Sequence, residues 1–258
     1  MSTLSYAVSD SATMLRRDFR HMLRYPMMAI SGVGTPTFFL LLFVYVFGGA
    51  MGHALGGATY IDYVVPGILV MAVGSGSAAT AINVNADMAE GIIARFRTMA
   101  ISRASVLTGQ VVASVIQTMV SIGLVIGIAL LMGFRSTAGP AEWIAAIGVL
   151  AMLTLAFTWL AVAFGLVTKT PGGANSSTLP LLVLPFISSA FVRPDSMPAG
   201  LRWFAENQPF TPIIDTLRGL LLGAPIGHSA DLAVAWCAGI TLLGYLWARA
   251  AYNRDPAR

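Results

Sequence analysis

Six long apolar stretches divide the chain, and the charged residues lie between them. No Asp, Glu, Lys or Arg occurs between Arg24 and Asp62, for example, or between Arg103 and Arg135. The stretches do not alternate polar with apolar residues, as the strands of a membrane barrel would. Because about 20 apolar residues in an α-helix cross a bilayer, the pattern predicts six spans. We place these spans near residues 27–50, 61–84, 107–132, 143–167, 174–192 and 231–250.

Composition supports the same class of protein. Hydrophobic residues make up 57% of the 258 residues and charged residues only 10%, whereas a soluble domain averages about 25% charged residues. We therefore predict an all-α integral membrane protein, with residues 1–258 forming a single transmembrane domain. The single cysteine, Cys237, lies in an apolar run, which excludes a disulfide framework. The first 25 residues contain no apolar core, so we expect no cleaved signal peptide.

The Lys and Arg residues predict the orientation of the spans, because these residues concentrate in cytoplasmic loops. With the N-terminus inside, 11 of the 15 Lys and Arg residues lie in the cytoplasm. The outer ones are Arg135, Arg193, Arg202 and Arg218. Asp62, Glu142 and Asp231 agree with this orientation, because each begins an inward-running span, where a carboxylate meets the positive end of the helix dipole. Both termini are thus expected in the cytoplasm, at the inner membrane of a bacterium.

Residues 1–26 form a basic arm before the first span. Arg16, Arg20 and Arg24 recur at helical spacing with Arg17 beside them, and apolar residues such as Phe19 fall on another face. A helix of this kind lies in the membrane interface, with its basic side toward anionic headgroups. The arm is either a plain topology anchor or also a surface for a partner, and one helix could serve both purposes.

The internal segment between the second and third spans has the composition of a docking helix. Ile92, Ile93, Phe96 and Met99 recur at roughly helical spacing and could fill an apolar groove in a soluble partner. Basic residues beside them could pair with acidic residues at the rim of that groove. The alternative is a helix on the membrane surface that lipid headgroups hold. The candidate residues for docking are Glu90, Gly91, Ile92, Ile93, Arg95, Phe96, Arg97, Met99 and Arg103.

The external segment 193–230 predicts two short helices between spans five and six. Its second apolar run is about 13 residues long, too short to cross a bilayer of about 30 Å. We expect short re-entrant or surface helices with a break at Pro209 and Pro212. Asp215 and Arg218, three residues apart, could pair with each other. The segment is either an outer gate or a structural cap on the bundle. The gate candidates are Asn207, Pro209, Pro212, Asp215 and Arg218.

Small, polar and proline residues inside the spans predict how the helices pack. Gly123 and Gly127 form a GxxxG pattern, which allows close approach of another helix. We interpret the amides Asn83, Gln117 and Asn175 as hydrogen-bonding groups between helices. Pro180 and Pro185 should bend the fifth span.

The chain lacks the residues that several kinds of membrane protein need for their chemistry. Its one lysine, Lys169, follows Thr168 and not a glycine-rich turn, so no P-loop for ATP exists. The three histidines are far apart, and the spans contain no ionisable residue of the kind that proton- or sodium-driven carriers use. We therefore expect no enzyme activity and no cofactor on this chain. If the protein transports a substrate, the energy must come from a partner.

The chain resembles the permease subunit of type-2 ABC exporters, the group that includes daunorubicin/doxorubicin-resistance permeases of actinobacteria. The resemblance covers most of the chain. Beyond the basic arm and the six spans it includes the internal stretches 90–97 and 101–107, and the external stretches 206–212 and 215–219. The external stretches resemble the family's outer NPxTP…LRG pattern. Ala100 departs from relatives, which often have proline there, and this puts in doubt how the internal loop fits a partner.

The resemblance implies an assembly and a mechanism. Two such permeases, identical or related, form the pathway, and each docks a separate ATP-binding subunit that holds ATP and Mg. The internal segment would act as a coupling helix, and the external short helices would gate the outer end. The expected partners are thus two ATPase subunits, a second permease chain, the lipid bilayer and a hydrophobic or amphiphilic substrate, with no nucleic acid. The alternatives are a non-transporting scaffold or regulator, a lipid-linked polysaccharide permease and, disfavoured by its uncharged spans, a secondary carrier.

Overall fold

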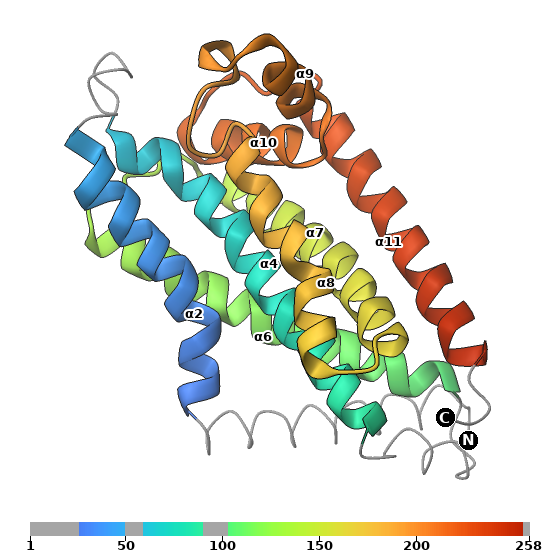
Figure 1. Cartoon of the computed structure of the whole chain (residues 1–258). Helices are drawn as coiled ribbons and strands as arrows, with labels where there is room; N and C mark the ends of the chain where they lie inside the picture. Colours follow the sequence, from blue (N-terminus) through green and yellow to red (C-terminus); the bar gives the residue numbers. More distant parts are fainter. Residues whose placement is uncertain (1–25, 50–58, 90–102, 255–258) are drawn as a thin grey trace.

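A computed structural model describes residues 26–49, 59–89 and 103–254 of the chain (Figure 1). Every regular element within these ranges is a helix, and four of the helices are long and apolar enough to cross a membrane. The four are α4 (Tyr60–Ala89), α6 (Arg103–Leu131), α7 (Pro140–Val167) and α11 (Ser229–Arg254). The prediction of an all-α, multi-pass membrane protein is therefore confirmed.

Helix α4 is the centre of the bundle. It contacts α6, α7 and the shorter helices α2 (Pro26–Leu41) and α8 (Pro171–Val183), while α11 packs along α7 (Figure 1). In its most apolar window α4 is 72% buried, against 17% for α11. A helix that is apolar all round and buried on most sides occupies the core of a bundle. The positions of α2, α6, α7 and α8 are therefore fixed largely by their contacts with α4.

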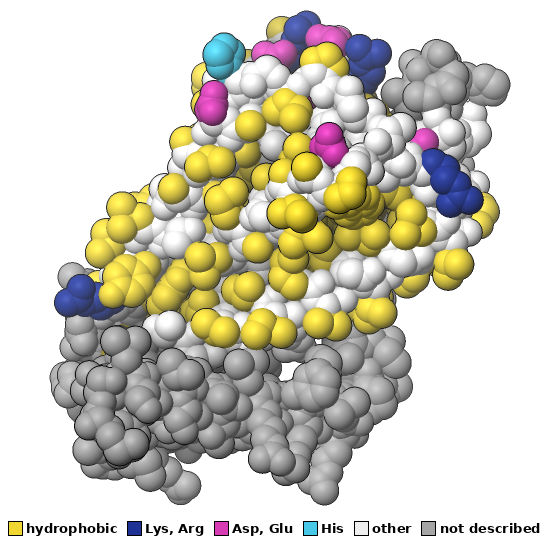
Figure 2. Space-filling view, turned by 180° about the vertical axis from the view of Figure 1, so that it is seen from behind, with side chains coloured by type: hydrophobic (Ala, Val, Ile, Leu, Met, Phe, Trp, Pro, Cys, Tyr) yellow, Lys and Arg dark blue, Asp and Glu magenta, His cyan; other side chains and the backbone are white. Residues whose placement is uncertain are grey.

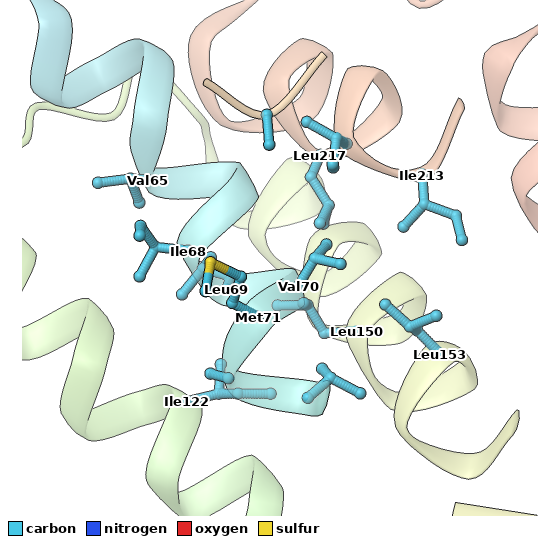
Figure 3. Packing of buried hydrophobic residues seen from close by; sticks show 14 of the residues in the cluster. Val65, Ile68, Leu69, Val70, Met71, Ile122, Leu150, Leu153, Ile213 and Leu217 are labelled. Atoms are coloured by element: carbon cyan, nitrogen blue, oxygen red, sulfur yellow. The ribbon is translucent and has the colours of Figure 1, made fainter. Parts of the chain in front are cut away.

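The main core cluster joins α4 to three other helices. Figure 3 shows side chains of α4 between those of α6, α7 and α10 (Phe210–Leu222). Lipid tails are as apolar as these side chains, so their contact stabilises the bundle through close packing and dispersion. The residues labelled in the figure are Val65, Ile68, Leu69, Val70, Met71, Ile122, Leu150, Leu153, Ile213 and Leu217.

Glycines of α4 set the distance to the neighbouring chain. A Cβ atom at Gly74 would lie 2.8 Å from the carbonyl oxygen of Leu181 in α8, and one at Gly67 would lie 2.6 Å from the Cβ of Ala190. No larger residue fits at these contacts without moving the backbone. By contrast, no described atom lies within 4 Å of a Cβ placed at Gly123 or Gly127. The close approach predicted from the GxxxG pattern is therefore absent within the described chain.

Two of the predicted spans differ in form from the prediction. The first apolar stretch is α2 followed by a π-helical segment, η1 (Leu42–Phe47). The fifth, predicted over 174–192, is the 13-residue helix α8 followed by a 3₁₀ turn, η3 (Leu184–Ile187). The irregularity predicted at Pro185 is present: the residue lies in the 3₁₀ turn and has no N–H to donate to the carbonyl four residues earlier, whereas Pro180 lies inside α8. The α-helix is therefore not continuous over 174–192. Residues 188–193 then run on without regular helix.

The predicted acidic caps are confirmed. Asp62, Glu142 and Asp231 lie in the first turns of α4, α7 and α11. The Asp62 carboxylate also accepts a hydrogen bond of 3.1 Å from the backbone N–H of Arg135, in the connection between α6 and α7. Figure 2 shows an apolar band across one face of the molecule, with charged side chains gathered toward its ends. This distribution is typical of a protein that a bilayer surrounds.

Replacing Gly74 with alanine should destabilise the bundle. The added methyl group would meet the Leu181 carbonyl, and overpacking of this kind costs about 1–3 kcal/mol. Unfolding of the purified protein in detergent micelles would measure the change. Gly123→Ala is the matched control, because the site is open and alanine favours helix. Equal stability of the two variants would contradict the close contact between α4 and α8.

Candidate functional site

The structure describes only some of the residues that the sequence predicts to be functional. The basic arm with Arg16, Arg17, Phe19, Arg20 and Arg24 lies outside the described residues, as does the docking segment from Glu90 to Ala100 that includes Arg95 and Arg97. Arg103 is the first residue of α6. The docking and interfacial roles of these residues therefore stay predictions. The external segment, by contrast, is described throughout.

The external segment folds as two short helices, as predicted. These are α9 (Ala199–Asn207) and α10 (Phe210–Leu222), after a short 3₁₀ turn, η4 (Pro194–Ser196). The chain breaks at Gln208 and Pro209, so this part of the predicted break is confirmed. Pro212 does not break the chain: it lies in the first turn of α10, where no helical hydrogen bond needs its missing N–H.

The sequence of α10 buries one face and leaves another polar. Phe210, Ile213, Ile214, Leu217 and Leu221 recur at helical spacing and are buried, and the Phe210 ring meets Phe157 of α7 edge to face. The helix ends at Gly223, whose φ of 70° is left-handed and suits glycine. The two gate candidates, Asp215 and Arg218, lie outside this apolar stripe and are partly exposed.

Arg218 joins three parts of the chain. Its Nη1 donates to Asp215 Oδ1 at 2.8 Å, which confirms the predicted pair. Its Nη2 donates to the carbonyl oxygens of Ser189, at 2.7 Å, and Tyr63, at 3.2 Å. The guanidinium carbon also lies 4.0 Å from the centroid of the Tyr63 ring, a cation–π contact. The side chain of Arg218 is only 14% exposed, so water replaces few of these contacts.

Ser189 completes what we call the α10 network: Tyr63, Ser189, Thr211, Asp215 and Arg218. The Ser189 hydroxyl donates to Asp215 Oδ1 at 2.7 Å, and the Tyr63 hydroxyl donates to the Ser189 carbonyl at 3.0 Å. The Ser189 N–H donates to Thr211 Oγ1, which itself donates to the carbonyl of Ala205 in α9. The network therefore fixes α9, α10 and the linker 188–193 to the first turn of α4.

The remaining gate candidates have local roles. The Asn207 side chain is exposed and donates to the Trp203 carbonyl within α9, so it does not enter the α10 network. Pro209 precedes the first residue of α10. Sequence reasoning missed Tyr63 and Ser189. The signal for Ser189 was a pair of serines inside a predicted span, whereas Tyr63 had no signal besides its place near the end of one.

A second polar cluster lies at the other end of α4. The Asn85 side chain is 3% exposed, and its Nδ2 donates to the carbonyl oxygens of Thr168, at 2.6 Å, and Gly165, at 3.2 Å. These carbonyls belong to the end of α7, where helix carbonyls lack partners within the helix. A Cβ at Gly165 would lie 2.7 Å from the Ala81 carbonyl, so the two backbones are in close contact. We call Asn85, Gly165 and Thr168 the Asn85 joint.

The joint corrects the prediction about amides. Asn83, Gln117 and Asn175 are exposed, and their side chains have no hydrogen-bond partner among the described residues. The amide that does bond between helices is Asn85, which the sequence did not single out. The available signal was its position on one face of α4 with Gly74 and Ala81, both of which contact neighbouring chain.

Aromatic rings hold α2 beside the chain that follows α8. Phe43 stacks on Phe191 with ring centroids 4.1 Å apart, and Phe39 meets Phe186 edge to face at 5.3 Å. Phe186 and Phe191 flank Ser189 in the sequence. The linker that enters the α10 network is therefore fixed by apolar contact with η1, through Phe43, as well as by hydrogen bonds.

Potential metal ligands do not cluster in the described part of the chain. No three His, Cys, Asp or Glu side chains gather within the described ranges. A groove of about 540 Å³ between α7 and α11 is lined by apolar residues together with Thr241 and Tyr245. The Thr241 hydroxyl bonds to the carbonyl of Cys237 in its own helix. The candidate functional features of the structure are therefore the polar contacts between helices, namely the α10 network and the Asn85 joint.

Comparison with known proteins gives consistent matches. The sequence profile of the family described as "ABC-2 type transporter" matches residues 11–222. The chain is similar to the daunorubicin resistance ABC transporter permease protein DrrB1 of Streptomyces coeruleorubidus, at 28% identity over 235 residues that cover 91% of this chain and 82% of the relative. It is also similar to the probable doxorubicin resistance ABC transporter permease protein DrrC of Mycobacterium tuberculosis (strain CDC 1551 / Oshkosh), at 25% identity over 214 residues that cover 83% and 77% of the two chains.

Replacing Arg218 with lysine should loosen α10. Lysine keeps the charge but cannot reach three acceptors with a planar fork, and a lost hydrogen bond to a charged group costs about 1.5–3 kcal/mol. Hydrogen exchange of the α10 amides in the purified protein would report the loss as faster exchange. Arg202→Lys is the control, because the Arg202 pairs with Asp195 and Glu206 lie in solvent. Exchange as slow as in the wild type would show that Arg218 does not hold α10.

Proposed function

The chain belongs to the ABC-2 type transporter family, and we propose that it is the permease subunit of an ATP-driven exporter. The observation that carries the proposal is the match of the family profile to residues 11–222. Four apolar helices of spanning length support it. In this proposal two permease chains, identical or related, form the pathway, and two separate ATP-binding subunits supply the energy with ATP and Mg. The absence of a P-loop from the sequence supports this division of labour.

Six spans complete the proposed membrane topology. The helix α2 with η1, and α8 with the linker after it, are the two crossings beyond the four long helices. The excess of Lys and Arg in the proposed internal segments supports cytoplasmic termini. The acids in the first turns of α4, α7 and α11 support the direction of these helices. The α9–α10 segment then lies at the outer face of a bacterial inner membrane.

The proposal gives each end of the bundle a role. At the outer end, α9 and α10 form a gate that the α10 network holds in place. At the inner end, the segment containing Arg95 and Arg97 is the coupling helix that docks in the ATPase, and the basic N-terminal arm lies in the membrane interface. The partly buried pair of Asp215 and Arg218 supports a gate that moves as one unit, because separating either charge from its partners is costly.

The proposed substrate is a hydrophobic or amphiphilic molecule, such as a drug, a natural product or a lipid. The printed names of two relatives refer to daunorubicin and doxorubicin resistance, and the uncharged spans of this chain suit such cargo. The proposal predicts a P-loop ATPase encoded beside the gene, and co-expression with that ATPase tests it. Vanadate-sensitive accumulation of doxorubicin in inverted membrane vesicles is expected. An ATPase that does not co-purify with the permease would favour a scaffold instead.

Reversing two charges in the coupling segment should uncouple the ATPase. The double variant Arg95→Glu, Arg97→Glu is expected to lower both transport and co-purification of the ATPase, because it removes ion pairs at the rim of the docking groove. Membrane insertion should be unchanged. The double variant Arg193→Glu, Arg202→Glu at the proposed outer end is the control and should keep the ATPase bound. Unchanged co-purification of the first variant would contradict docking through this segment.

Cysteine labelling should reveal the orientation. Ser196, beside α9, and Lys169, between α7 and α8, are both exposed, whereas Cys237 is buried and gives little background. An impermeant maleimide should label Ser196→Cys in intact spheroplasts and Lys169→Cys only after the membrane is opened. The reverse pattern would show that the N-terminus lies outside.

A further inference from the structure

Asn85 lies where the end of α4 meets the beginning of α8. The joint ties α4 to Thr168, and α8 begins at Pro171 with Thr170 as its N-cap, whose hydroxyl accepts from the Gly173 N–H at 3.1 Å. Only the short turn between Thr168 and Thr170 separates the joint from α8. A displacement of this end of α4 would therefore pull on the first turn of α8.

Helix α8 connects the Asn85 joint to the α10 network. Its far end, Val183, leads through η3 to Ser189, which bonds to Asp215, Arg218 and Tyr63. Along its length α8 contacts α4 at Gly74, with no room for a side chain between them. The stretch from Thr168 to Ser189, which contains α8, is thus hydrogen-bonded to α4 at both of its ends. Asn85 bonds to Thr168, and Tyr63 bonds to Ser189. The two positions are 22 residues apart in α4, or about 33 Å.

The bonding at Asn85 is directional and incomplete. Gly165 and Thr168 present carbonyl oxygens, which accept only, so the amide nitrogen must face them and the oxygen must point away. That oxygen, Oδ1, is buried and has no partner among the described residues. A buried acceptor without a partner raises the free energy of the arrangement that contains it. An arrangement that gave this oxygen a partner would remove that cost.

We propose that Asn85 is a positioning residue of the transport cycle, which passes movement of the end of α4 to α8 and, through α8, to Ser189 and the α10 network. The inference rests on the proposed function, because ATP binding supplies the movement. Asn85 touches neither ATP nor substrate in this role. It sets whether the turn at Thr168 follows α4 when the ATPase subunits close.

Hydrogen exchange of the complex with its ATPase, in lipid nanodiscs, tests the inference without a known substrate. Exchange would be compared without nucleotide and with ATP and vanadate. The wild type should show a nucleotide-dependent change at both 168–176 and 186–193. In Asn85→Leu the change at both segments should fall at least about fivefold, the lower end of allosteric coupling effects, while the ATPase stays bound and active. Asn85→Gln, which keeps the donor, should restore part of the change.

Asn83→Leu is the matched control, because it removes the same amide two residues away, on an exposed face where no described residue bonds to it. It should behave as the wild type. A melting curve checks the fold of each variant, and Asn85→Ala replaces Asn85→Leu if leucine prevents folding. A wild type without nucleotide-dependent change at 168–176, or an Asn85→Leu that responds like Asn83→Leu, would overturn the inference and leave the proposed function standing. Failure of any ATPase to co-purify would overturn the proposed function and this inference with it.

Discussion

In an apolar bilayer, helices gain little by hiding apolar side chains from one another, so their association depends on how closely their backbones approach. In this chain that approach is made at glycines. Gly67 and Gly74 of α4 admit the chain that follows α7, and Gly165 of α7 admits α4. Without these contacts the carbonyls of Gly165 and Thr168 would not come within reach of the Asn85 side chain. The polar contacts between the helices thus depend on glycines, which let the backbones come close together.

The two polar clusters lie at opposite ends of α4. The α10 network joins α9, α10 and the linker 188–193, because Arg218 and Ser189 connect α10 to the linker and Thr211 bonds to Ala205 in α9. The Asn85 joint binds the opposite end of α4 to the end of α7. A buried cluster that includes Trp159, Val84 and Tyr252 adds the last turn of α11 to that end. Both α4 and the segment that contains α8 run between these two clusters. Such connections suit a protein whose two ends must respond to each other.

Sequence patterning predicted the features that depend on local chemistry. The pair of Asp215 and Arg218 and the first-turn acids follow from helical spacing and the helix dipole, and they were confirmed. The end of α8 at Val183 was not predicted: a proline can lie inside a helix, as Pro180 does in α8, so the sequence predicted a bend at Pro185 and not an end of the α-helix. Ser189 and Asn85 were missed for another reason. Their partners lie 26 and 83 residues away, and nothing in a single sequence shows which amide or hydroxyl will face which carbonyl.

Asn83 and Asn85 show how small a difference in position decides which amide finds a carbonyl partner. The two amides share a helix, and a single residue separates them, yet Asn83 is exposed with no partner in the described part of the chain and Asn85 is 3% exposed. A rotation of about 100° per residue places Asn85, and not Asn83, on the side where Gly165 lets α7 approach. A buried amide is stable only with bonded partners, so the approach of α7 and the choice of asparagine at position 85 depend on each other. A larger residue at Gly165 should therefore weaken the joint as surely as the loss of Asn85 itself.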